Sequence, residues 1–172
     1  MIGGQELLRK LLSLRAGGAA EWAGPPCGLH ATVPAMTTVS VTDTFDAPVE
    51  RVWPHVSAFG DIDKYMRGID SLRVDGDGLG TDRVIGTPGG EIVERLTWLD
   101  DDAYGLSYTI VSGPIPVERY VATVKLSPQG ERCGIEWVGR FEPTGMSVED
   151  AQKTFSGVYG AIIKGVKRAL AS

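Results

Sequence analysis

The feature that most limits the fold of this chain is a series of short strand-like segments with only turns between them. Within them apolar and polar residues alternate, as in a strand with one buried face. A parallel neighbour would need a crossover of a dozen or more residues, and most of these turns are far shorter. We therefore predict a meandering antiparallel sheet of about seven strands, from the segments 37–45, 71–74, 83–85, 92–99, 106–111, 117–126 and 133–141.

Two short helices are expected directly after the first strand. Asp46 is placed to cap the first of them, with Pro48 in its first turn. Pro54 should end or kink this helix, because proline has no N–H to donate. A second short helical piece is expected near residues 62–66.

A long helix is expected at the C-terminal end. Ser147 and Asp150 resemble a capping box, and apolar residues then recur on one face as far as Leu170. A helix over residues 148–170 would be roughly 35 Å long, enough to cross a curved sheet. The sequence thus predicts an α+β fold in which a curved antiparallel sheet wraps a long C-terminal helix.

Residues 1–36 do not share this periodicity. Glycines and prolines recur from Gly17 to Pro34 and break any regular element, and Met36 stands directly before the first strand. We interpret residues 1–36 as a flexible N-terminal arm or leader, and residues 37–172 as the folded domain.

Composition disfavours several classes of function. The formal net charge of −5 argues against a protein that binds nucleic acid or anionic membranes. No apolar run is long enough to span a bilayer, and we expect a cytoplasmic protein. Cys27 and Cys133 lie far apart, and His30 and His55 have no partners at metal-ligand or triad spacing. We therefore expect no metal and no cofactor; the sequence does not indicate an oligomeric state.

Strand alternation indicates which polar side chains point into the domain. Glu94 shares its face with Ile92, Leu96 and Trp98, and Tyr108 and Tyr120 also lie on apolar faces. A carboxyl group on such a face must be paired or protonated. Glu94 is therefore either a pocket acid/base or ligand contact, or one half of an ion pair, for instance with Arg83. The two tyrosines are either pocket residues or ordinary core residues.

The same periodicities predict a cavity between the helix and the sheet. We expect it to be walled by Glu94, Tyr108, Tyr120 and Ile110 of the sheet, and by residues on one face of the long helix. The helix residues are Phe155, Tyr159, Ile162 and Val166. Gly157, Gly160 and Gly165 leave either room for a ligand or a close helix–sheet contact.

Three segments resemble a known superfamily. Residues 45–53, Phe-Asp-Ala-Pro-Val-Glu-Arg-Val-Trp, are similar to the opening of START-like (SRPBCC) proteins, which include birch-pollen-type allergens and polyketide cyclase/dehydrase-like proteins. Residues 94–96, Glu-Arg-Leu, and residues 112–117, Ser-Gly-Pro-Ile-Pro-Val, are similar to plant abscisic-acid receptors. The resemblance covers about residues 38–170 and implies the helix-grip fold.

The resemblance also implies site residues. In the receptors one loop closes over the ligand and a second latches it; here these match residues 86–90, with Pro88, and residues 113–117, with Ile115 and Val117. Glu94 and Tyr120 match inward receptor residues, and so does Glu136. Strand alternation places Glu136 outward instead, but we follow the resemblance because a bulge shifts alternation.

Two departures from the receptors bear on the ligand. The receptor lysine that meets the hormone's carboxylate falls on Asp70, and Ile115-Pro116 replaces a His-Arg pair. A carboxylate ligand bound in the receptors' way is thereby disfavoured. With Glu94, Glu136 and Asp70, the pocket would suit a neutral, hydroxylated or amine-bearing molecule.

Two functions follow as leading hypotheses. The first is a carrier or binding protein for a small apolar metabolite such as a polyketide, a lipid or an aromatic compound. The second is a cyclase/dehydrase-type enzyme without a cofactor, in which Glu94 with Tyr120 or Tyr108 would move protons. A structural or regulatory interaction module is a third interpretation.

Overall fold

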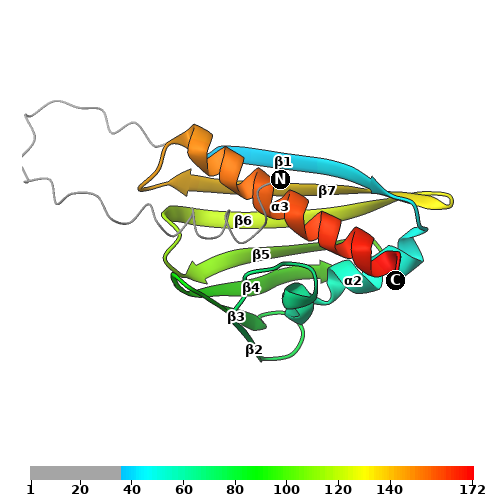
Figure 1. Cartoon of the computed structure of the whole chain (residues 1–172), viewed down its shortest axis with the longest axis horizontal. Coiled ribbons are helices and arrows are strands. Elements are labelled where there is room, and N and C mark those ends of the chain that lie inside the picture. The colour runs from blue at the N-terminus through cyan, green and yellow to red at the C-terminus, as the bar shows by residue number, and fades with distance from the viewer. Residues whose placement is uncertain (1–35) are drawn as a thin grey trace, which may run out of the picture.

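The computed structural model describes residues 36–172 of the chain (Figure 1). Seven strands form one antiparallel sheet in the order β1-β7-β6-β5-β4-β3-β2. The strands are β1 (Thr37–Phe45), β2 (Ser71–Asp75), β3 (Asp82–Thr87), β4 (Gly90–Asp100), β5 (Gly105–Ser112), β6 (Val117–Gln129) and β7 (Arg132–Pro143). Strands β2 to β7 form the expected meander, and β1 joins its far edge beside β7. The predicted α+β helix-grip architecture is confirmed. The proposed N-terminal arm lies outside the described residues, except Met36.

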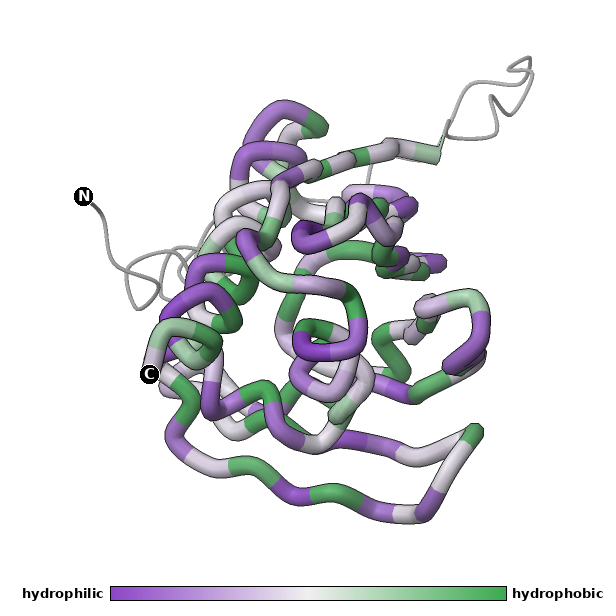
Figure 2. The backbone as a smooth tube through the Cα atoms, turned by 90° about the vertical axis from the view of Figure 1, so that its right-hand side faces the viewer, coloured by the Kyte–Doolittle hydropathy of each residue, from purple (hydrophilic) through white to green (hydrophobic). Residues whose placement is uncertain are grey.

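The sheet is curved, and its concave face carries the core. Figure 2 views the molecule along the strands, with α3 on one side of the curled sheet. On β6, Tyr120, Ala122, Val124 and Leu126 are buried, while Val121 and Lys125 between them point outward and are exposed. This alternation is that of an antiparallel sheet with one face covered by a helix.

Helix α3 (Val148–Leu170) covers the concave face. It begins as predicted: the Ser147 hydroxyl accepts a hydrogen bond from the Asp150 N–H and donates one to the Asp150 carboxylate. Its buried face includes Phe155, Tyr159, Ile162 and Val166. A Cβ on Gly165 would overlap the backbone carbonyl of Tyr65, so this glycine allows a close contact between α3 and the segment before β2.

The helices after β1 differ in detail from the prediction. Helix α2 (Val49–Ser57) has Pro48 as its N-cap and no side-chain cap; Asp46 instead pairs with Arg132. Pro54 lies inside α2, and the helix continues for three residues beyond it. The second helix, η1 (Phe59–Lys64), is a 3₁₀ helix that begins before the expected segment.

Irregular pairing between β4 and β5 changes one expected orientation. The register shifts between Leu96 and Trp98, so the alternation seen in the sequence does not continue through Trp98. The Trp98 ring lies 5.7 Å from the ammonium group of Lys125, an outward-facing residue of β6. The prediction that Trp98 shares the inner face with Glu94 was wrong.

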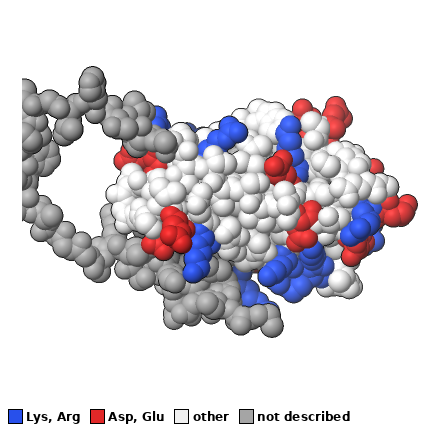
Figure 3. Space-filling model, turned by 90° about the horizontal axis from the view of Figure 1, so that it is seen from above, with Lys and Arg blue, Asp and Glu red and all other residues white. Residues whose placement is uncertain are grey.

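The face of the molecule on the β1 side carries both positive and negative side chains, and neither sign dominates. Lysine and arginine side chains lie there among aspartates and glutamates, with a broad uncharged area between them (Figure 3). Among residues 36–172, no helix has the length and apolar character needed to cross a bilayer.

Candidate functional site

A buried ion pair lies at the centre of the candidate site. Arg83 and Glu94 are directly opposite each other on β3 and β4, and Arg83 Nε donates to Glu94 Oε2 at 2.6 Å. The side chains are only 6% and 11% exposed. A second guanidinium N–H donates to the Phe59 carbonyl at 2.9 Å. The sequence left two interpretations of Glu94 open, and the structure shows the ion pair with Arg83.

Aromatic rings hold the guanidinium group in place. Arg83 Cζ lies 4.1 Å from the centre of the Phe59 ring and 4.9 Å from that of Tyr108. Such cation–π contacts are strongest where water is excluded. The carboxylate of Glu94 is thus neutralised by a cation that is itself fixed from two sides.

Three tyrosines surround this pair. The hydroxyl groups of Tyr120 and Tyr159 lie 2.6 Å apart and share a hydrogen bond. A Cβ on Gly139 of β7 would overlap the Tyr159 hydroxyl, so the glycine provides the space in which that hydroxyl lies. Only one of the two protons is used between these hydroxyls, which leaves the other for a further acceptor.

Burial keeps these tyrosines in the neutral form. Desolvation raises the pKa of Tyr108, and the nearby charge of Glu94 adds to the shift. The pKa values of Tyr120 and Tyr159 are raised by the same desolvation first, and then by neighbouring groups. The three groups are therefore hydrogen-bond donors at neutral pH rather than phenolate bases.

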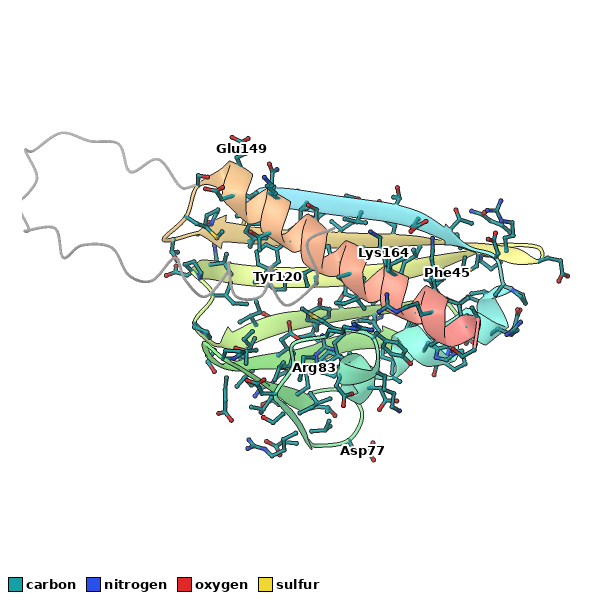
Figure 4. The ribbon with its side chains drawn as sticks, in the orientation of Figure 1. Phe45, Asp77, Arg83, Tyr120, Glu149 and Lys164 are labelled. Atoms are coloured by element: carbon teal, nitrogen blue, oxygen red, sulfur yellow. The ribbon has the colours of Figure 1, made fainter. Side chains whose placement is uncertain are left out.

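Two small cavities flank the Arg83 and Tyr108 side chains. Figure 4 shows Arg83 and Tyr120 extending from the sheet on the side covered by the helices. The first cavity, of about 50 Å³, is lined by Ile62, Met66, Ile69, Arg83, Ile85, Ile92, Glu94, Tyr108, Ile110, Ile115, Tyr120, Phe155, Val158, Tyr159 and Ile162. The second, of about 30 Å³, is lined by His55, Val56, Ala58, Phe59, Ile62, Tyr65, Arg83, Leu106, Tyr108, Val124, Ile135, Trp137, Ile162, Ile163 and Val166.

The cavities are much smaller than the predicted pocket. Sites for small molecules usually enclose about 300–1,000 Å³. Here aromatic rings fill most of the space; for example, Phe155 lies 5.0 Å from Tyr120 and 4.6 Å from Phe141, centre to centre. A ligand of ordinary size therefore requires the helix or the loops to move outward.

Most of the residues singled out from the sequence come together here. Glu94, Tyr108, Ile110, Ile115, Tyr120, Phe155, Tyr159 and Ile162 line the first cavity, and Val166 lines the second. Val117 is half-buried and packs against the core beside them.

Three of the expected site residues lie elsewhere. Glu136 is exposed on the outer face of the sheet, because the pairing of β7 with β1 and β6 continues around it without the bulge that an inward position would need. Asp70 is exposed in the segment before β2. Pro88 is exposed in the turn between β3 and β4. Placing the Glu136 side chain at the pocket was wrong. Asp70 and Pro88 do not line either cavity, and contact between these two residues and a ligand stays a prediction.

The proposed closing loop is shorter than expected. Gly86 and Thr87 belong to β3 and Gly90 to β4, so only Pro88 and Gly89 lie between the strands. The Thr87 hydroxyl donates to the Gly90 carbonyl at 2.7 Å and closes the turn. Movement of this region would involve the whole β3–β4 hairpin, since two residues are too few to swing alone.

The proposed latch contacts this turn and the loop before α3. A Cβ on Gly90 would lie 3.7 Å from Pro114, so the two segments are in contact. The Thr144 N–H donates to the Pro116 carbonyl at 2.9 Å, which ties the latch to the loop before α3. Closure by these segments stays a prediction.

Sequence reasoning missed two parts of the site. Trp137 faces inward and stacks on Tyr159, with ring centres 5.0 Å apart and planes at 10°. Its alternation with Ile135 and Phe141 could have identified it. The wall formed by Phe59, Ile62 and Tyr65 had no such signal, because a 3₁₀ helix lacks a regular apolar repeat. In the described part of the chain, no three His, Cys, Asp or Glu side chains are grouped as metal ligands.

A family model described as polyketide cyclase / dehydrase and lipid transport matches residues 36–171. The chain belongs to this family. The match covers nearly all of the described residues, and so includes both cavities and the ion pair between them.

One curated relative in this comparison is a plant receptor. Abscisic acid receptor PYL2 of Arabidopsis thaliana is 29% identical over 100 residues, which are 55% of this chain and 53% of the receptor. The chain thus spans about half the length of that relative.

Solved structures agree on the fold. Protein XoxI from Bacillus cereus is 26% identical with a TM-score of 0.72, over 79% of this chain and 96% of that one. Norcoclaurine synthase from Thalictrum flavum, in complex with dopamine and hydroxybenzaldehyde, has a TM-score of 0.69 at 16% identity, over 90% of this chain and 97% of that one. At that identity the synthase shows a shared fold and no more.

Proposed function

We propose that this chain binds a small, neutral, largely apolar molecule between α3 and the sheet, as a carrier or binding protein. The observation that carries the proposal is the group of buried polar side chains in otherwise apolar surroundings. Arg83 and Glu94, which form an ion pair, and Tyr120 and Tyr159, whose hydroxyl groups share a hydrogen bond, are all among the residues that line the first cavity. A few polar groups on an apolar wall are typical of a ligand site.

The charge balance supports a neutral ligand. Among residues 36–172, the charged side chains that line the first cavity are Arg83 and Glu94, and they are paired with each other; Arg83 also donates to the Phe59 carbonyl. A charged ligand would lose its hydration without gaining a free counter-charge. An uncharged polyketide-like, lipid or aromatic molecule would lose little hydration free energy on entering the cavity.

The family assignment supports ligand binding in general terms. Its description covers both cyclase/dehydrase activity and lipid transport. The plant relative is named a receptor for abscisic acid, which is a small molecule, although the match spans half of that protein.

Enzymatic cyclisation or water loss is the second candidate function. The free proton of the Tyr120–Tyr159 hydroxyl pair favours it, since such a donor can stabilise negative charge that develops on a carbonyl oxygen. Proton abstraction by Glu94 is disfavoured while Arg83 neutralises it. The binding role therefore fits the geometry better.

Native mass spectrometry of the full chain tests the binding role. We expect a co-purifying small molecule that is released by organic extraction and identified by its mass. Replacing Ile110, which lines the first cavity, by Phe should greatly reduce that adduct. The matched control is Val111→Phe on the exposed outer face, which should retain it.

Thermal unfolding of both variants separates loss of binding from loss of folding. An adduct that persists equally in a folded Ile110→Phe variant would contradict a site in this cavity. Turnover of a bound polyketide that falls by orders of magnitude in a folded Tyr120→Phe variant would instead favour the enzyme.

A further inference from the structure

The buried ion pair between Arg83 and Glu94 is held by one hydrogen bond between the two side chains. Arg83 Nε donates to Glu94 Oε2 at 2.6 Å, and Arg83 Nη1 donates to the Phe59 carbonyl at 2.9 Å. Within residues 36–172, Arg83 Nη2 and Glu94 Oε1 take part in no hydrogen bond. One donor and one acceptor of the pair are therefore unused.

The exposed pair beside it has a more complete geometry. One position along the same two strands, Arg95 donates from both Nε and Nη2 to the two oxygens of Asp82, at 2.7 Å each. Arginine and carboxylate groups are often joined by two parallel bonds of this kind. The buried pair lacks the second bond, although unmet hydrogen-bonding groups cost more free energy inside a protein than at its surface.

The unused donor and acceptor are neighbours that border the first cavity. The guanidinium group is a rigid fork in which Nε and Nη2 share one edge, so an N–H of Nη2 points to the side on which Glu94 lies. Both atoms belong to buried side chains, but neither is completely enclosed by the described protein. Both therefore border open space, and the cavity that Arg83 and Glu94 line together is the first one.

We propose that the ligand of the first cavity carries a hydrogen-bond donor directly beside an acceptor, as a carboxamide or lactam does. Its carbonyl oxygen would accept from Arg83 Nη2 while its N–H donates to Glu94 Oε1. The inference rests on the proposed binding function and names the polar group of the ligand. The apolar remainder would contact the aliphatic wall, which includes Ile62, Ile110 and Ile115.

Other polar groups satisfy this pair less well. A ketone can accept from Arg83 but has no proton for Glu94. A carboxylate presents two acceptors and brings its charge close to that of Glu94, and an amidinium presents two donors and brings its charge close to that of Arg83. A neutral amide is the one of these four groups that bonds both side chains without adding a charge.

Four probes of nearly the same shape test the assignment. Benzamide, acetophenone, benzoate and benzamidine each carry a planar carbon with two further heavy atoms on a phenyl ring. We expect the full chain at pH 7 to bind benzamide at least about 10-fold more tightly than acetophenone, since a hydrogen bond to a charged group contributes more than one between neutral groups. Benzoate and benzamidine should bind more weakly than acetophenone. Titrations followed in ¹H–¹⁵N spectra measure the four affinities, and benzamide should shift the side-chain N–H resonances of Arg83.

Two variants assign the preference to the buried pair. The double variant Arg83→Met/Glu94→Leu replaces both polar groups by apolar ones and should bind benzamide no more tightly than acetophenone. Arg95→Gln breaks the neighbouring exposed pair and should retain the preference for benzamide. Circular dichroism shows that each variant is folded, and the comparison of probes in the wild-type chain does not depend on either variant.

The possible failures are distinguishable. Equal affinities for benzamide and acetophenone, a preference for benzoate or benzamidine, or a benzamide preference that persists in the folded double variant would overturn the inference and leave the binding function standing. If none of the four probes bound the wild-type chain, its interior would not admit a small aromatic molecule, and both proposals would fail.

Discussion

Replacing Glu94 by Gln should destabilise the domain more than most single substitutions do. The change removes the counter-charge of Arg83 but keeps the shape of the side chain. Because the partners are only 6% and 11% exposed, water cannot replace the lost carboxylate. Removing one member of a buried pair typically costs about 3–5 kcal/mol. We expect a loss of that size in the free energy of unfolding, measured by urea titration with circular dichroism.

The neighbouring ion pair provides the control. Asp82 and Arg95 are opposite each other one position along the same strands, but Arg95 is 47% exposed. Arg95→Gln should therefore cost about 1 kcal/mol or less.

The double variant Arg83→Met/Glu94→Leu tests the reasoning further. It removes both buried charges, so it should be more stable than Glu94→Gln alone. A cost below about 1 kcal/mol for Glu94→Gln, or a double variant no more stable than the single one, would refute this explanation.

Four further predictions follow from the structure. Gly139→Ala should lower the free energy of unfolding by about 1–3 kcal/mol, because the added Cβ displaces the Tyr159 hydroxyl. Gly160→Ala should raise it by up to about 1 kcal/mol, because a Cβ there meets nothing within 4 Å. Chemical unfolding of the two variants measures both changes. The pKa values of the three cavity tyrosines are raised on folding, so their contribution to stability should be constant up to about pH 10. Above that pH the free energy of unfolding should fall, because the unfolded chain loses phenolic protons first; an alkaline unfolding series with no such fall would contradict this. Deletion of residues 1–35 should leave the melting temperature within a few degrees, and a larger drop would make them part of the fold. Bound ligand should slow amide exchange at Gly89 and Gly113 more than in β6; equal protection throughout would exclude closure at that end.

The order of elements was predictable because two periods dominate the sequence. Short alternating segments with tight turns allow only antiparallel neighbours, and one apolar stripe from Ala151 to Leu170 requires a helix that covers the sheet. Both signals are local. The pairing of β1 with β7 is not local, and the residue pattern carries no signal for it.

The site was harder to predict because it depends on long-range packing. Alternation placed Glu94 and Tyr120 correctly on the inner face, and it also placed Glu136 outward before the resemblance was preferred. The register shift before Trp98 has no counterpart in the residue pattern. The cavity volume depends on how the aromatic rings fill the space, which no periodicity records.

The glycine at position 165 gives α3 two unlike halves. Its contact with the Tyr65 backbone holds the C-terminal half against the segment before β2. The N-terminal half is attached to the β1 edge by a hydrogen bond from the exposed Gln152 side chain to the Thr38 carbonyl, 3.0 Å long. If α3 moves outward to admit a ligand, we expect it to pivot about the close contact at Gly165. Substitutions around Phe155 would then alter how far the helix moves, and those around Val166 would alter the contact about which it pivots.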